Sequence, residues 1–124
     1  MQLTTAEWKI IKLLWNKPRT IMQLTKELQD DTQWTKHTII VLLKRMLEKN
    51  TVYFEMNGRA KVFYPNVSRD DAETEEAETM LDKAFDGSFS LMVSTLLSNN
   101  KISEAEINEL CKILNLERVN KDRE

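Results

Sequence analysis

The chain has 124 residues, of which 41% are hydrophobic and 31% charged, with a formal net charge of −2. This length predicts one domain or two small ones sharing a core, and the composition argues against a disordered chain. No apolar run approaches the ~18 residues of a membrane span, no signal peptide is visible, and a single cysteine, Cys111, excludes an internal disulfide or multi-cysteine metal site. We therefore expect no membrane insertion and a cytoplasmic location.

The charges are divided unevenly between the two halves of the chain. Residues 1–65 carry 11 Lys and Arg against 6 Asp and Glu, a net charge of +5, whereas residues 66–124 carry 7 against 14, a net charge of −7. This asymmetry indicates that the first half binds a polyanion. Gly and Pro occur only twice each, which favours a mainly helical fold over one with many tight turns.

Capping signals open two short helices near the N-terminus. Residues 4–7, TTAE, have the spacing of a capping box, and apolar residues of helical period follow until Pro18. Thr20 repeats the signal and predicts a second helix over residues 20–29, with a turn at residues 30–31. The first half is thus expected to begin with two packed helices.

A third helix is predicted over residues 35–49, with Thr35 as its N-cap and Asn50 near its end. Its inward stripe comprises Ile39, Leu42, Leu43, Met46 and Leu47. Two runs of β-branched and aromatic residues, 51–55 and 62–64, flank Asn57-Gly58, a strong hairpin signal. Three helices followed by a two-stranded hairpin predict a winged helix-turn-helix domain over residues 1–66, in which the third helix enters the DNA major groove and the wing around Asn57-Gly58 follows phosphates.

The predicted DNA-binding residues lie on the outer face of the third helix and at the wing tip. They are Thr35, Lys36, His37, Thr38, Ile40, Val41, Lys44, Arg45, Arg59 and Lys61. Apolar Ile40 and Val41 suit contacts with thymine methyl groups, whereas the lysines and His37 suit bases or phosphates. The alternative is a winged-helix protein-interaction module without specific DNA binding, and a further one is a regulator that binds a small ligand between the wing and the later helices.

The acidic half predicts a three-helix dimerisation domain over residues 67–119, followed by a frayed tail at 120–124. Each helix has an apolar stripe, and so small a unit buries too little surface to be stable alone. The predicted dimerisation residues are Met80, Leu81, Phe85, Phe89, Met92, Val93, Leu96, Leu97, Ile107, Leu110 and Leu114. A two-fold homodimer would cover them, and the alternative is that they pack back onto the basic half of the same chain.

Several stretches resemble the penicillinase repressor family, which includes β-lactamase, methicillin-resistance and copper-responsive repressors. They are TAEW (5–8), LLW (13–15), WTKHTI (34–39), LLKRM (42–46) and VFYP (62–65), with FDGS (85–88) and ISEAEINEL (102–110) resembling the dimerisation region. The resemblance implies a homodimer that represses transcription by binding an inverted-repeat operator in double-stranded DNA.

The chain departs from two branches of that family. Copper-sensing members have paired cysteines near the C-terminus, and this chain has only Cys111. Resistance repressors are cleaved at an Asn-Phe bond that aligns with Thr95-Leu96 here, which leaves the releasing signal, an inactivating protease and any upstream sensor open.

No enzyme motif is present. The sequence has no Gly-rich phosphate loop or serine elbow, and His37 is its only histidine. Cys111 lies on an apolar helix face, where a buried, unreactive thiol is expected. We therefore predict no catalytic residue, no metal site and no cofactor.

Overall fold

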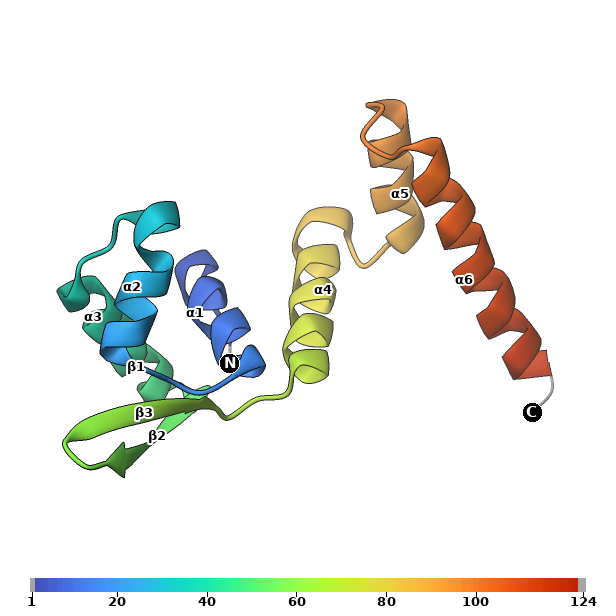
Figure 1. Cartoon of the computed structure of the whole chain (residues 1–124). Helices are drawn as coiled ribbons and strands as arrows, with labels where there is room; N and C mark the ends of the chain where they lie inside the picture. The colour runs from blue at the N-terminus through green and yellow to red at the C-terminus, as the bar shows by residue number, and fades with distance from the viewer. Residues whose placement is uncertain (1, 123–124) are drawn as a thin grey trace. The chain divides into compact units, whose positions relative to one another are not determined.

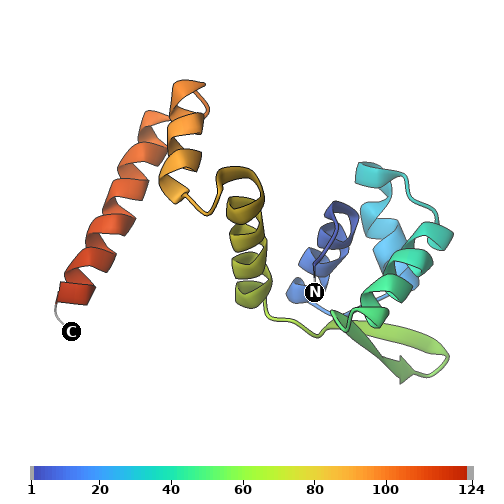
Figure 2. The same cartoon turned by 180° about the vertical axis from the view of Figure 1, so that it is seen from behind.

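The computed structural model describes residues 2–122 and divides into two compact units, Met1–Ala77 and Glu78–Glu124. The elements of the first unit are α1 (Thr5–Asn16), β1 (Arg19–Thr20), α2 (Ile21–Thr32), α3 (Lys36–Glu48), β2 (Val52–Asn57), β3 (Ala60–Pro65) and the beginning of α4 (Arg69–Phe85). Three helices pack together and a hairpin extends beyond them, as both views show (Figures 1 and 2). The predicted winged helix-turn-helix fold is confirmed.

The first three helices begin at the predicted caps. Thr4 and Glu7 form a capping box at α1, and Thr20 and Gln23 form one at α2. Thr35 caps α3 by accepting a hydrogen bond from the backbone N–H of Thr38. These side chains satisfy N–H groups that the first turn of a helix leaves unpaired, so the start of each helix is encoded locally.

The second helix is longer than predicted. The sequence predicts a turn at residues 30–31, but α2 continues to Thr32, and Gln33 then ends it with a left-handed φ of 58°. Lys9 of α1 holds this last turn with an ion pair to Asp31, whose Nζ and Oδ2 atoms are 2.7 Å apart. Contact with another helix therefore overrides the turn propensity of two adjacent aspartates.

The sheet has three strands in the order β1-β3-β2, all antiparallel. The sequence predicts the hairpin but not β1, a strand of two residues. Arg19 of β1 is opposite Phe63 of β3, and its guanidinium is buried where it donates to the carbonyl oxygens of Leu13 and Lys17 and to the Glu27 carboxylate. This network fastens the sheet to α1 and α2.

The hairpin turn is displaced by one residue from the predicted position. Asn57 pairs with Ala60, so the two-residue loop consists of Gly58 and Arg59 rather than Asn57 and Gly58. Gly58 has a φ of +65°, a left-handed conformation that glycine adopts without strain. The shift places Arg59 at the tip of the wing.

The core of the first unit is formed by side chains from α1, α2, α3 and the sheet. Its fully buried members include Ile10, Ile11, Leu14, Leu24, Ile39, Leu43 and Met46. The predicted inward stripe of α3 is confirmed, except that Leu47 is only partly buried and packs at the edge of the core. Packing of this stripe fixes which face of α3 remains in solvent.

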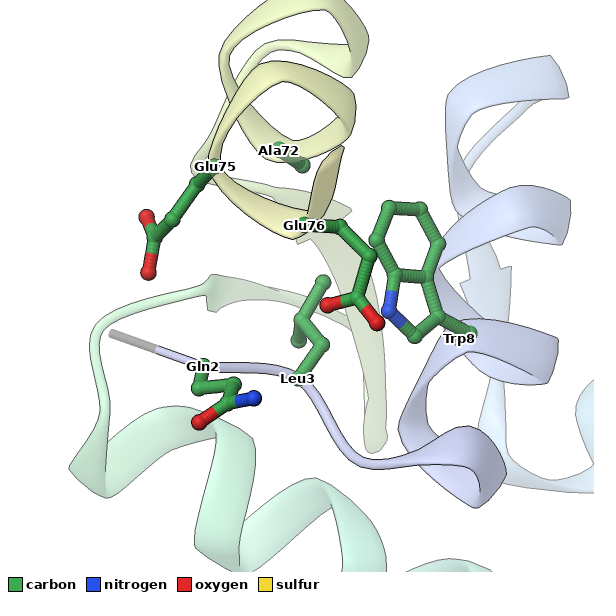
Figure 3. A pocket seen from close by; sticks show the side chains of 6 residues that line it. All are labelled: Gln2, Leu3, Trp8, Ala72, Glu75 and Glu76. Carbon is green, nitrogen blue, oxygen red and sulfur yellow. The ribbon is translucent and has the colours of Figure 1, made fainter. Parts of the chain in front are cut away.

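The first unit extends beyond the predicted boundary after residue 66. Ala72 of α4 is buried in the same core as Leu3, and both side chains line a small pocket beside Trp8 (Figure 3). Trp15 Nε1 donates to the Val67 carbonyl oxygen at 2.9 Å. The first turns of α4 are therefore part of the winged-helix unit, and the division falls after Ala77.

The second unit contains the end of α4, α5 (Phe89–Ser98) and α6 (Glu104–Asp122). Ser88 caps α5, and Ser103 and Glu106 form the predicted capping pair of α6. The tail expected to fray from residue 120 continues α6 to Asp122, and residues 123–124 lie outside the described part. Within residues 2–122, no helix is both long and apolar enough to cross a membrane.

Candidate nucleic-acid interface

The solvent face of α3 carries most of the predicted DNA-binding residues. Lys36, His37, Lys44 and Arg45 are exposed, and so is Ile40, with 41% of its surface accessible. Val41 differs, since it is half-buried beside the core stripe. The prediction placed two apolar side chains on this face, but only Ile40 is exposed between the basic side chains of α3.

Two of the predicted DNA-binding residues, Thr35 and Thr38, also stabilise the start of α3. The Thr35 and Thr38 hydroxyls are 3.3 Å apart, and Thr35 caps α3 as described above. Their hydroxyls are thus partly engaged at the start of the helix. Thr35 remains exposed and Thr38 is half-buried.

The wing supplies two further cations. Arg59 is exposed at the hairpin tip, and Lys61 follows on β3, opposite Met56. The Lys61 ammonium lies 4.7 Å from the centre of the Phe54 ring, a cation–π contact that holds it against the hairpin. Tyr53 and Tyr64 stack across the two strands with ring centres 5.2 Å apart, which stiffens the wing.

A groove separates α3 from the wing, and the beginning of α2 also lines it. Its lining residues are Thr20, Ile21, Met22, Lys36, Ile40, Arg59, Ala60 and Lys61. Three of them are cationic and, among these lining residues, none is acidic. The groove unites Lys36 and Ile40 of α3 with Arg59 and Lys61 of the wing. We name it the α3–wing groove.

The remaining predicted residues lie outside the α3–wing groove. His37, Val41, Lys44 and Arg45 do not line it, although all but Val41 are exposed on α3. Arg45 is in the last turn of the helix, where a cation also suits the negative end of the helix dipole. A ligand that reaches them must extend along α3 beyond the groove.

Sequence reasoning missed Met22. Its side chain is 70% exposed and lines the α3–wing groove, although methionine is usually an interior residue. A signal was present, because Met22 is out of phase with the buried pair Leu24 and Leu28 of the same helix. Helical periodicity alone therefore assigns it to the outer face.

The second unit exposes a large apolar surface. No residue of 89–98 or 104–120 is buried, and the eleven predicted dimerisation residues are all exposed or half-buried. Met80 is 44% exposed, Phe89 43% and Leu114 52%. A second apolar stripe on α6, missed by the sequence analysis, comprises Ile113, Leu116 and Val119. The expectation of a buried thiol is wrong for the single chain, since Cys111 is exposed.

Within the described residues, no group of three or more His, Cys, Asp or Glu side chains is arranged to hold a metal ion. The small pocket beside Trp8 is lined by Gln2, Leu3, Trp8, Ala72, Glu75 and Glu76, and the Glu76 carboxylate lies beside the indole ring (Figure 3). The α3–wing groove, by contrast, brings three cationic side chains together with no acidic one among its lining residues.

Comparison with known proteins agrees with this geometry. The family described as Penicillinase repressor matches residues 3–116. The penicillinase repressor of Bacillus licheniformis is 30% identical over 91% of this chain and 89% of its own length. The methicillin resistance regulatory protein MecI of Staphylococcus aureus is 24% identical over 92% of this chain and 94% of its own.

Two solved structures share the fold. The solution structure of the DNA-binding domain of the repressor BlaI superposes with a TM-score of 0.52 at 28% identity, covering 56% of this chain and 87% of that domain. The complex structure of hsRosR-S4 gives 0.53 at 18% identity, covering 79% of this chain and 89% of that one, and supports the fold alone.

Proposed function

The chain belongs to the penicillinase repressor family, and we propose that it represses transcription as a homodimer bound to an inverted-repeat operator. Members of this family are transcriptional repressors and not enzymes. In our proposal α3 enters the major groove of double-stranded DNA and the β2–β3 wing follows adjacent phosphates. Its place of action would be the cytoplasm, where bacterial DNA lies.

The observation that carries the DNA-binding proposal is the α3–wing groove. Lys36, Arg59 and Lys61 come from two elements that are distant in sequence, yet their side chains line one concavity. A phosphodiester strand that passes between the recognition helix and the wing would be neutralised on both sides. Such contacts release counterions and supply affinity that is independent of sequence.

Base readout would come from the middle of α3. Ile40 is exposed at the groove, where an apolar side chain suits the thymine 5-methyl group. His37 and Lys44 present hydrogen-bond donors from the same helix. Phosphate contacts would thus set the position of α3, and these side chains would set its sequence preference.

The exposed apolar surface of the second unit supports the homodimer. The stripes of α4, α5 and α6 leave Met80, Phe89, Leu97 and Leu114 more than two-fifths exposed. Large exposed apolar side chains that recur at helical spacing on three helices favour an association site. A two-fold dimer would cover it with identical stripes and would present two copies of α3 to two half-sites.

The test is selection of bound duplexes from a random DNA pool at physiological salt, followed by sequencing. We expect enrichment of an inverted repeat with half-site centres about one helical turn, ~34 Å, apart. The variant Lys36→Ala/Arg59→Ala/Lys61→Ala should enrich far less, whereas Lys12→Ala, a change at an exposed lysine of α1, should behave as the parent. A folded parent protein that enriches no sequence would contradict the repressor proposal and favour a protein-interaction module.

A further inference from the structure

Met22 has the highest exposed fraction, 70%, among the large hydrophobic side chains that the structure describes as exposed. It stands in the first turn of α2, and at 100° per residue it projects about 160° from Leu24, which anchors the buried face. Folding of the unit therefore gives this side chain no contact with the core. A large apolar side chain that is exposed to solvent and lines a groove suggests contact with a bound ligand.

The surroundings of Met22 define the chemistry of that ligand. It lines the α3–wing groove with the cations Lys36, Arg59 and Lys61 and with exposed Ile40. It also lines an adjoining hollow between α2 and α3 together with Lys26, Asp30 and Lys36. The three cations of the α3–wing groove suit an anionic ligand, and the exposed side chains of Met22 and Ile40 suit one that also offers apolar atoms.

Duplex DNA meets both requirements. Its phosphates match the three cations, and the thymine 5-methyl group is the apolar feature that the major groove displays. Methionine has a flexible, polarizable side chain that adapts to such a contact. A protein partner would meet the apolar side chains but would need an extended acidic surface to match the cations, so continuity with the α3–wing groove favours DNA.

We propose that Met22 is a specificity-determining residue of the DNA interface and that, together with Ile40, it packs against thymine methyl groups. The inference rests on the proposed DNA-binding function. It extends base readout from α3 to the first turn of α2, an element otherwise suited to backbone contacts. Apolar readout then comes from two helices and covers more than one base pair.

The test uses the full-length protein and the duplex that it selects from the random pool. We expect Met22→Ala to bind that duplex about 5- to 20-fold more weakly, because several apolar atoms that would be buried against DNA are removed. Met22→Leu should remain within about 2-fold of the parent, since it keeps the apolar volume. Lys12→Ala is the control, at an exposed residue of α1 that lies outside both the groove and the wing.

Replacing each thymine by uracil, which lacks the 5-methyl group, locates the contact. In the parent protein, uracil at a contacted position should weaken binding about 4-fold, the value of one buried methyl group. At least one such uracil replacement should have no effect on binding by Met22→Ala but should still weaken binding by Lys12→Ala. That double result would establish the proposed contact.

Three results would overturn the inference. The first is that Met22→Ala binds the duplex as tightly as the parent. The second is that Met22→Ala binds more weakly but is still weakened further by uracil at every position that weakens the parent, which would exclude a contact between Met22 and a methyl group. The third is an equally weakened binding by Lys12→Ala, which would show that the effect is not particular to the groove. If the parent protein selects no DNA sequence, the repressor proposal fails and this inference fails with it. If the parent selects a sequence and one of the three results above is found, only this inference fails.

Discussion

The Nζ atom of Lys49, the C-cap residue of α3, lies 2.6 Å from Oε1 of Glu7, whose side chain is completely buried in the first turn of α1. The Thr4 backbone N–H also donates to Oε1, at 2.8 Å. Lys49 in turn donates to the Gln2 carbonyl oxygen at 2.8 Å. These contacts tie the end of α3 to Gln2 and to the start of α1.

Removing the cation from this pair should destabilise the winged-helix unit. Lys49→Met leaves the buried Glu7 carboxylate without its counter-charge, and we expect a decrease of about 2–3 kcal/mol in the free energy of unfolding. This is below the full value for a buried pair because a third of Lys49 is exposed. Urea denaturation measures the decrease. Lys49→Met/Glu7→Gln should recover part of it, and a double variant no more stable than Lys49→Met would contradict the pairing.

The same pair makes stability depend on pH. Burial raises the pKa of Glu7, but the hydrogen bonds from Lys49 and Thr4 and the Lys49 charge lower it, and the net pKa is below the ordinary value of 4.5. A lowered pKa in the folded state contributes stability above the unfolded-state pKa, which disappears as pH falls through the folded-state value. The free energy of unfolding, measured by urea denaturation at successively lower pH from pH 7, should show this decrease in stability.

Lys49→Met should weaken that contribution. Without the cation, burial still raises the pKa of Glu7 and only the hydrogen bonds from Thr4 lower it, so the folded-state pKa should be higher than in the parent and less stability is lost on acidification. The stability gap between variant and parent should therefore narrow as pH falls below about 5. A constant gap over this range would show that Glu7 is not the titrating group.

Arg59 and Lys61 should act on DNA phosphates rather than on bases. Replacing either with Ala should weaken binding to all duplexes by similar factors and should reduce the slope of log K against log salt by about 0.9 for each phosphate that is no longer neutralised. Titrations at several salt concentrations, with specific and random duplexes, measure both. Lys12→Ala should leave the slope unchanged, and a variant of Arg59 that changes base preference would contradict the assignment.

Ile40→Ala should change sequence preference more than affinity for random DNA. Its shortened side chain would no longer reach one apolar base group, for which we expect about 3- to 10-fold poorer discrimination at one position of each half-site. Val41→Ala is the comparison within the same helix. Because Val41 is half-buried, its truncation should lower stability with less effect on base preference. Sequencing of selected duplexes distinguishes these outcomes.

Leu114→Lys should separate the proposed dimer. The side chain is 52% exposed in one chain, so the substitution leaves the fold of the subunit intact but places an unpaired charge in the interface. Sedimentation velocity should show at least about a 10-fold weaker self-association. Asn115→Lys introduces the same charge at the adjacent exposed residue. If Leu114→Lys and Asn115→Lys both remain dimeric, Leu114 does not lie in the interface.

The helix starts, the hairpin and the inward face of α3 could all be predicted from the amino-acid sequence. Thr4, Thr20 and Thr35 cap their helices through contacts three residues away, and the stripe of α3 follows from helical period alone. These features depend on the chemistry and spacing of residues that are close together in the sequence, so a short segment is enough to predict them. The family resemblance rested on the order of the same elements.

The features that join distant segments could not be predicted in this way, because they arise from packing in three dimensions. The strand β1 exists because buried Arg19 binds three segments and lies opposite Phe63. The ion pair of Glu7 with Lys49 and the burial of Ala72 likewise join residues separated by most of a domain. Packing also left Met22 at the α3–wing groove. Such contacts depend on how helices pack in space, and their partners have no fixed sequence spacing from which to predict them.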